Sequence, residues 1–291
     1  MNPKEGEILY IDKPLRWTSF DVVNKVRWLL CKRLGVKKLK VGHAGTLDPL
    51  ATGVMIVCTG RATKRIDELQ AGVKEYVATL RLGATTPSFD LEHEIDAYYP
   101  TEHITREQVE RTLQQFIGRI EQVPPSYSAV KVDGKRAYDL ARKDKDVELK
   151  PKILVIDEIE LLEFRPLSSS PRVEDSMSFD SPQPGKRLSP SRGELGEDPI
   201  PRTGMRNKAF LTAPVGTAAS DDYPSISIRV VCSKGTYIRA LARDIGVALG
   251  SGAHLTALRR TRVGDVSVDD CLRMDTFPQW LEQQEIEINQ D

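Results

Sequence analysis

Alternating hydrophobic and polar positions predict two long β-strands. In Ser225–Ser233 (SISIRVVCS) every second residue is apolar, and Ile153–Phe164 (ILVIDEIELLEF) is rich in branched apolar residues. The strand from Ser225 places four apolar side chains on one side: Ile226, Ile228, Val230 and Cys232. Shorter strands are expected at Ile8–Ile11, Met55–Thr59 and Tyr76–Leu82.

Apolar residues spaced three and four apart predict three helices. Thr105–Gln108 has the form of a capping box, and it opens a helix that Gly118 closes, with Val109, Leu113, Phe116 and Ile117 inward. Ser19 is expected to cap a helix that runs through Leu30. A third helix is predicted from Tyr237 to Leu249, with Gly250 after it. Strands in runs with interspersed helices indicate an α+β fold, with a mixed, largely antiparallel sheet flanked by helices.

The stretch between the two long strands has a different composition. Residues 165–222 hold 8 of the chain's 18 prolines, nine serines and eight charges of each sign, and their apolar residues show no period. Such a segment buries too little surface to offset the entropy of ordering it. We therefore expect a disordered insertion at 165–222, within a β-hairpin of a single domain formed by 1–164 and 223–291.

The charged residues are unevenly distributed along the chain, which a net charge of zero does not show. The 291 residues carry 42 basic and 42 acidic side chains, but residues 13–65 hold twelve Lys/Arg against two Asp, and 229–262 hold seven against one. Two basic blocks indicate one positive face that suits a polyanion. No apolar run approaches 18 residues, so a membrane protein is not expected. The four cysteines lie far apart and the N-terminus has no apolar leader, which indicates a cytoplasmic protein with reduced thiols.

A glycine-rich segment, Val41–Gly53, carries the first candidate chemistry. It contains His43, Asp48 and the stiffening Pro49, and it matches no phosphate-binding loop. His43 and Asp48 are only two candidate metal ligands, so a metal hydrolase is poorly supported. From the residues alone, Asp48 is either a turn former or a catalytic carboxylate.

Three further segments point toward RNA. Ser233–Arg239 lies between a strand and a helix start, where Lys234 and Arg239 add positive charge. Leu258–Arg262 contains three arginines, and Arg259 and Arg260 are candidates for phosphate contacts. Tyrosines alternate with Lys and Arg from residue 124 to 138, which suits looped RNA. Together these segments favour an RNA-binding cleft around one carboxylate.

Five sequence blocks resemble those of the TruB family, the tRNA pseudouridine-55 synthases. They are GHAGTLDPLATG, KEYVATLRLG, PPSYSAVKVDGKRAYDLAR, CSKGTYIR and LRRTRVG, in the family's order, and the resemblance covers roughly 8–164 and 225–264. The family members that the chain is expected to resemble are those of the bacterial type that lack a full C-terminal PUA domain, because the chain ends about 27 residues after Gly264. The loop from Gly83 to Asp90 differs from the Asp-rich loop common in the family.

The resemblance implies that the protein isomerises a T-loop uridine of tRNA to pseudouridine, without metal or cofactor, after the nucleotide is flipped out of its stack. Asp48 is then the catalytic residue, acting on the sugar or base, and Arg239 is expected to pair with it and lower its pKa. Tyr76 is the third residue expected to be catalytic: it would stack on the uracil and assist removal of the C5 proton. Leu258 is expected to form an apolar wall of the pocket, and Tyr237 to place a second aromatic ring near the site. Lys13 is expected to position the loop, and His43 is expected to contact the RNA.

Two other functions stay open at this stage. One is an RNA chaperone that folds tRNA without catalysis, and the other is the same isomerisation on another structured RNA. The expected partner is the T-arm of tRNA, bound by a monomer, with no nucleotide cofactor and no membrane.

Overall fold

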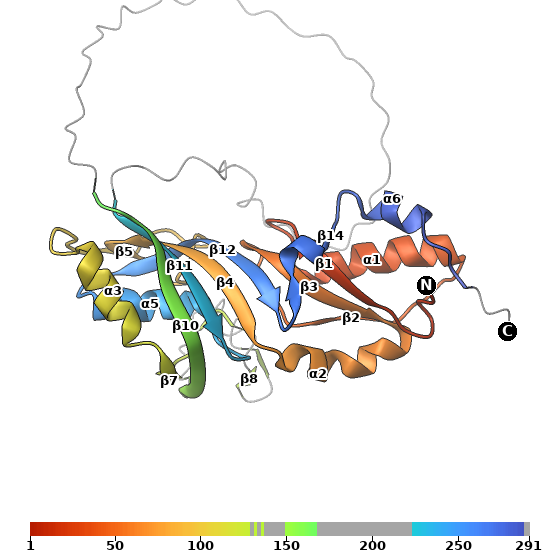
Figure 1. Ribbon diagram of the computed structural model, residues 1–291, viewed down its shortest axis with the longest axis horizontal. Coiled ribbons are helices and arrows are strands. Elements are labelled where there is room, and N and C mark those ends of the chain that lie inside the picture. Colours follow the sequence, from red (N-terminus) through yellow and green to blue (C-terminus); the bar gives the residue numbers. More distant parts are fainter. Residues whose placement is uncertain (129–130, 133–134, 137–148, 168–222, 288–291) are drawn as a thin grey trace, which may run out of the picture. The chain divides into compact units, whose positions relative to one another are not determined.

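A ten-stranded sheet forms the centre of the computed structural model, which describes residues 1–128, 131–132, 135–136, 149–167 and 223–287 (Figure 1). Eight strands follow one another across it: β14 (Leu272–Arg273), β1 (Ile8–Lys13), β3 (Ala51–Thr59), β12 (Ala253–Val263), β4 (Lys74–Leu82), β11 (Ser225–Cys232), β10 (Lys152–Arg165) and β7 (Gly118–Gln122). β2 (Val41–Ala44) pairs with β3, and β13 (Val266–Ser267) pairs with β12.

Most pairings in this sheet are antiparallel, as expected, so the predicted fold class is confirmed. The exceptions are β1 with β14 and β3 with β12, which are parallel. Two small antiparallel pairs lie outside the sheet: β5 (Ala84–Thr85) with β6 (Ala97–Tyr98), and β8 (Lys131–Val132) with β9 (Lys135–Arg136). Five α-helices are described: α1 (Ser19–Leu34), α2 (Ile66–Ala71), α3 (Arg106–Gln114), α5 (Ile238–Ala248) and α6 (Phe277–Glu282). Short 3₁₀ turns span Gly60–Arg65 and Val268–Asp270.

The predicted hairpin is present. β10 and β11 pair antiparallel, and their register ends with Arg165 opposite Ser225. The four apolar side chains assigned to one side of β11 are all buried. Arg165 still belongs to β10, so the strand reaches one residue beyond its predicted end. Residues 168–222, which hold nearly all of the predicted insertion, lie outside the described residues, and their disorder stays a prediction.

The helices differ from the predictions mainly at their ends. The N-cap of α1 is Thr18 and not Ser19, because the Thr18 side chain and Asp21 form a reciprocal capping box. The helix also continues past Leu30 to Leu34, where Gly35 adopts the left-handed conformation that ends it. Thr105 caps α3 as predicted, but Ile117, expected inward, is exposed. The helix α5 is confirmed with Tyr237 as its N-cap residue.

Several strands of the structure were not predicted, and two of them, β2 and β12, position the candidate site. β2 lies within the glycine-rich segment that reads as a loop, and β12 carries the arginine cluster. The arginines of β12 interrupt the alternation of apolar and polar residues from which a strand is predicted. Whether an arginine is buried depends on distant partners, which a local pattern does not show.

α1 and α5 cover the same face of the sheet. Ala51 of β3, Leu258 of β12 and Ala78 of β4 are lateral partners, so their side chains share one face. On that face α1 packs over Met55 and Val57 of β3, while α5 packs over the buried residues of β4. The two helices thus stand on one side of the sheet, with the β3–β12 junction exposed between them.

The close approach of β3 to β12 requires glycine at position 53. Gly53 has φ +103°, and a Cβ there would lie 2.1 Å from the carbonyl oxygen of Arg260. Gly118 has a similar φ of +94°, but a Cβ there would meet nothing within 4 Å.

This pair of glycines gives a matched test of stability. We expect Gly118→Ala to lower the free energy of unfolding by about 1–2 kcal/mol, the cost of the left-handed conformation alone. Gly53→Ala should cost more than about 3 kcal/mol, because the strands must also move apart. Urea unfolding followed by circular dichroism measures both, and equal losses would contradict the close approach.

Candidate active site

Asp48 lies in the turn between β2 and β3, and its neighbours are held by the segment that joins β1 to α1. The buried Ser19 hydroxyl donates a hydrogen bond to the Leu47 carbonyl (3.0 Å) and accepts one from the Leu47 N–H (2.9 Å). On the other side, the Arg16 N–H donates to the Pro49 carbonyl (2.8 Å). The residues before and after Asp48 are therefore fixed by the start of α1.

Lys13 also contacts this turn. Its side chain is fully buried, and its ammonium donates to the carbonyls of Pro14 (3.0 Å) and Trp17 (2.5 Å), with Pro49 at 3.4 Å. Burial lowers the pKa of Lys13 to about 8, and the nearby Asp48 carboxylate opposes that shift. This placement agrees with the expected positioning role of Lys13.

Arg239, in the first turn of α5, is in contact with Asp48. Its Nε lies 2.8 Å from Asp48 Oδ2 and 3.6 Å from Asp90 Oδ2. Its two terminal nitrogens donate to the carbonyls of Ser88 (3.2 Å) and Tyr127 (2.9 Å). Since the side chain is only 6% exposed, these contacts fix the plane of the guanidinium and direct its Nε edge at Asp48.

Asp90 is a member of this cluster that the sequence interpretation missed. It follows Phe89, whose φ of +61° is unusual for a bulky residue. The turn closes through a hydrogen bond from the Phe89 N–H to the Thr86 carbonyl (3.1 Å). It aims the Ser88 carbonyl and the Asp90 carboxylate at the same guanidinium. The only sequence signal was an acidic residue at the end of an irregular loop.

The pKa of Asp48 departs from its ordinary value in the direction opposite to the expectation. A single guanidinium neighbour was expected to lower its pKa, but burial raises the pKa of Asp48 above its ordinary value. Arg239 opposes this shift, and the Asp90 carboxylate adds to it. Two carboxylates thus share one guanidinium, which leaves the cluster an excess negative charge.

A small pocket lies beside this cluster and is open to solvent. Asp48, Asp90 and Arg239 supply its polar wall. The other lining residues are mostly apolar: Leu50, Ala51, Leu91, Leu255, Thr256, Ala257 and Leu258. Leu258 therefore lies where a wall residue was expected. A few polar groups in a mainly apolar pocket are typical of small-ligand sites.

Tyr76, Arg260 and His43 lie behind the pocket and not on its wall. Tyr76 is 8% exposed and packs in the core with Leu47 and Ala51. Burial raises the pKa of its hydroxyl, against the Arg260 guanidinium, so the ring stays neutral at ordinary pH. Burial lowers the pKa of His43, and Arg260 adds to that shift. Stacking of Tyr76 on a bound base and an RNA contact by His43 stay predictions.

The structure contradicts the phosphate contact expected of Arg260. The side chain is 2% exposed, and its guanidinium donates to the carbonyls of Val54 (2.7 Å) and Gly45 (3.3 Å). Such a buried cation holds the β2–β3 segment together and does not reach a phosphate in solvent.

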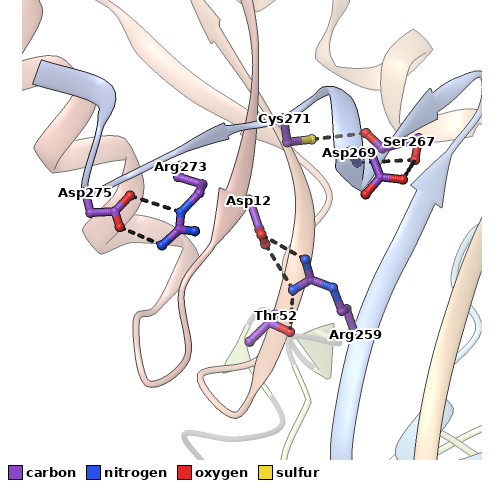
Figure 2. Close-up of polar contacts among 8 residues, drawn as sticks. All are labelled: Asp12, Thr52, Arg259, Ser267, Asp269, Cys271, Arg273 and Asp275. Atoms are coloured by element: carbon purple, nitrogen blue, oxygen red, sulfur yellow. Dashed lines mark hydrogen bonds and ion pairs between the residues drawn. The ribbon is translucent and has the colours of Figure 1, made fainter. Parts of the chain in front are cut away.

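Arg259 is not among the residues that line the pocket, and Figure 2 shows its polar contacts. It binds Asp12 through two nitrogens (2.9 and 3.3 Å) and donates to the Thr52 hydroxyl (3.3 Å). Because side chains alternate along a strand, Arg259 and Thr52 face the side of the sheet opposite Leu258 and Ala51. Arg259 therefore does not line the pocket, and the phosphate contact expected of it stays a prediction.

Tyr237 and Lys234 lie at the start of α5, near Arg239. Tyr237 is half-buried, and its N–H donates to the side-chain oxygen of Gln122 (2.9 Å). Burial raises the pKa of its hydroxyl, and nearby Asp48 adds to the shift. Lys234 is exposed in the turn between β11 and α5. Both are close enough in sequence to Arg239 to serve the same site.

Comparisons with known proteins decide the family. The N-terminal domain of TruB family pseudouridylate synthases matches residues 32–179, and the C-terminal domain of tRNA pseudouridylate synthase B matches 239–289. The chain is 61% identical over 287 residues to a tRNA pseudouridine synthase B of Phocaeicola vulgatus, covering 99% of this chain and 98% of that protein. It is 59% identical to the Bacteroides thetaiotaomicron protein of that name, covering 100% and 99%.

The chain belongs to the TruB family of pseudouridylate synthases. It is thus an isomerase, and the resemblance drawn from five sequence blocks is confirmed. Among solved structures, a Cbf5–Nop10–Gar1 complex matches with a TM-score of 0.56 and 25% identity, and an H/ACA RNP bound to a substrate RNA with 0.53 and 24%. The matches cover 97% and 96% of this chain but only 57% and 56% of those chains.

Two further findings concern the described residues as a whole. Among the residues that the structure describes, no group of three His, Cys, Asp or Glu side chains could hold a metal ion. No helix in the described part of the chain is long and apolar enough to cross a membrane.

Removal of the Ser19 hydroxyl tests how the turn that carries Asp48 is positioned. We expect Ser19→Ala to lower kcat by about tenfold with little change in KM, because the Leu47 N–H and carbonyl lose their partner beside Asp48. Steady-state kinetics on an RNA substrate measures the split. Ser227→Ala, which removes a hydroxyl bonded to Thr79 elsewhere on the sheet (3.2 Å), is the control and should leave kcat unchanged.

The raised pKa of Asp48 predicts how activity depends on pH. If the ionised carboxylate is the reactive form, kcat falls as pH drops through a pKa above that of an ordinary Asp. Asp90→Asn removes a charge that raises this pKa, so the acid limb should move to lower pH. Asp269→Asn, at an exposed carboxylate, should leave the limb in place. A limb that moves to higher pH in Asp90→Asn would contradict the shared-guanidinium arrangement.

Proposed function

We propose that this protein converts a uridine in the T-loop of tRNA, position 55, to pseudouridine. The observation that carries the proposal is the 2.8 Å contact between Asp48 and Arg239 at the polar wall of a mainly apolar pocket, in a TruB family chain. The relatives that match over almost the whole chain bear the name tRNA pseudouridine synthase B, which supports tRNA as the substrate.

The geometry supports a mechanism on a flipped nucleotide. A uracil ring that leaves the base stack would enter between Leu50, Leu255 and Leu258, where apolar contacts offset part of the unstacking cost of a few kcal/mol. Its ribose would then lie near Asp48. The guanidinium holds Asp48 by Oδ2, which leaves Oδ1 for the sugar or base.

The reaction itself is balanced without any added group. The N1–C1′ bond breaks, the uracil turns, C5 bonds to C1′, the proton on C5 is lost, and N1 gains a proton. In the proposed roles, Asp48 attacks or deprotonates the nucleotide, Arg239 orients it, and Leu258 confines the turning ring. Tyr76 would take its place against the uracil only after a change from its buried position.

Two further proposals concern the cellular compartment and the oligomeric state. We place the reaction in the cytoplasm, which fits the four free cysteines. We also propose that the monomer is active, because a single chain is sufficient to supply both the ion-pair partner of Asp48 and the lining of the pocket.

Conversion of an unmodified tRNA transcript, with Asp48→Asn in parallel, tests the function. We expect one T-loop uridine to be converted by the parent protein without added metal or cofactor. Asp48→Asn should lose turnover by at least about 10⁴-fold while binding tRNA within a few-fold, because the amide keeps the shape but not the charge. Pseudouridine mapping and filter binding supply the two readouts.

Asp12→Asn is the matched control, because it makes the same change in a carboxylate that also binds an arginine, Arg259, on the opposite sheet face. This control should convert the uridine at the parent rate. Binding without conversion by the parent protein would instead favour a tRNA-folding chaperone. Conversion at a different uridine would move the assignment to another RNA, and equal conversion by Asp48→Asn would remove Asp48 from the mechanism.

A further inference from the structure

Arg243 is a second arginine on the face of α5 that carries Arg239. The two residues are four positions apart, about one turn of the helix, so their side chains are neighbours. One terminal nitrogen of Arg243 donates to the Val123 carbonyl (3.1 Å). Its guanidinium carbon lies 5.0 Å from the centre of the Phe89 ring, within the range of a cation–π contact. Arg243 thus joins two segments that are separate in the sequence, and it does not line the pocket.

These two segments are the ones whose carbonyls orient Arg239. Arg239 donates to the carbonyls of Ser88 and Tyr127, and Ser88 is the residue before Phe89. Between Val123 and Tyr127 the chain passes through two prolines, whose fixed φ angles leave little freedom in that link. A guanidinium that holds Val123 therefore also restricts where the Tyr127 carbonyl can lie.

The backbone at Phe89 gives the ring contact its importance. Phe89 has φ +61°, which costs a bulky residue free energy, so this conformation persists only where its surroundings hold it. Its N–H donates to the Thr86 carbonyl (3.1 Å), and its carbonyl accepts from the Leu255 N–H (2.9 Å). These bonds fix the main chain, and the Arg243 guanidinium lies over the side chain. The ring contact thus helps to hold a strained turn whose two flanking residues both face Arg239.

Arg243 supplies position more than charge. Oδ1 of Asp244 lies 2.8 Å from the Nε of Arg243 and 2.8 Å from one of its terminal nitrogens, so a carboxylate balances this guanidinium. The largest effect of a charge on the pKa of Asp48 comes from Arg239. An influence of Arg243 on Asp48 therefore passes through the placement of Arg239.

We propose that Arg243 is a positioning residue for the pair of Asp48 and Arg239. It holds the two segments whose carbonyls fix the Arg239 guanidinium, and so keeps the Nε edge directed at the carboxylate. Because catalysis depends on how closely the reacting groups are held, a looser guanidinium costs rate and not substrate affinity. The inference rests on the proposed function, in that Asp48 acts on a uridine of RNA.

Arg243→Ala tests this role through kinetics on tRNA and through the ionisation of Asp48. We expect kcat to fall about tenfold with KM within about twofold, because only the orientation of Arg239 changes. Arg239 opposes the rise in the pKa of Asp48, so a less firmly held guanidinium raises that pKa, and the acid limb of kcat moves to higher pH. NMR titration of the Asp48 carboxyl carbon, in protein without RNA, should show a shift in the same direction.

Two further variants separate positioning from a general loss of structure. Arg243→Lys keeps a cation over the Phe89 ring and a donor for the Val123 carbonyl, so kcat should return to within about threefold of the parent. Arg273→Ala is the matched control, since it removes an arginine that binds Asp275 through two nitrogens (2.7 and 3.2 Å) at the edge strand β14. It should leave kcat, KM and the acid limb unchanged. Melting curves would establish that each variant folds.

The proposal is overturned if Arg243→Ala keeps kcat within about twofold and leaves the acid limb in place. It is also overturned if KM alone rises, which would make Arg243 a substrate contact, or if Arg273→Ala has the same effect. Should Arg243→Ala fail to fold, Phe89→Leu removes the ring from the other side of the contact. That variant should move the acid limb in the same direction, and an unmoved limb would then overturn the proposal.

Failure of the proposed function would look different. In that case the parent protein would leave the T-loop uridine unconverted, while the NMR titrations of Asp48 in the parent and in Arg243→Ala could still be compared. The two hypotheses are therefore separated, because the carboxyl titration needs no substrate and conversion by the parent protein needs no variant of Arg243.

Discussion

The guanidinium of Arg239 is the constraint on which the rest of the site depends. It joins four segments that are far apart in the sequence: the Asp48 turn, the Ser88–Asp90 loop, the segment at Tyr127 and the start of α5. A buried cation is stable only with its hydrogen-bonding groups satisfied, so all four segments must be in place together. The positive φ of Phe89 is a local strain that this contact set offsets.

The framework around this cation explains several buried polar residues. Parallel pairing of β3 with β12 puts Ala51 beside Leu258 in the pocket wall, to which α5 contributes Arg239. Lys13, Ser19 and Arg260 satisfy backbone carbonyls of the turns and strands around Asp48. They position the turn while the pocket remains mostly apolar. The residues that position the turn are thus different from those that line the pocket, whose polar wall is formed by Asp48, Asp90 and Arg239.

Elements with a clear local period were predictable, and contacts between distant segments were not. The burial of one side of β11 and the cap at Thr105 follow from spacing alone. β12 was missed because Arg259 and Arg260 resemble a surface cluster, and their partners Asp12 and Val54 are some 200 residues away. Asp48 and Arg239 were found through the family's sequence blocks. Asp90 was not, because no periodicity marks a residue in an irregular turn.

The charges around the pocket bear on where the cations that attract RNA can lie. Asp48 and Asp90 together outweigh Arg239, and the pKa of the buried Lys13 lies near 8, so the pocket offers a polyanion little net attraction. Burial raises the pKa of Asp48, and any added phosphate nearby would raise it further. Cations that attract RNA are therefore better placed outside the pocket, where they bind the backbone without neutralising the carboxylate.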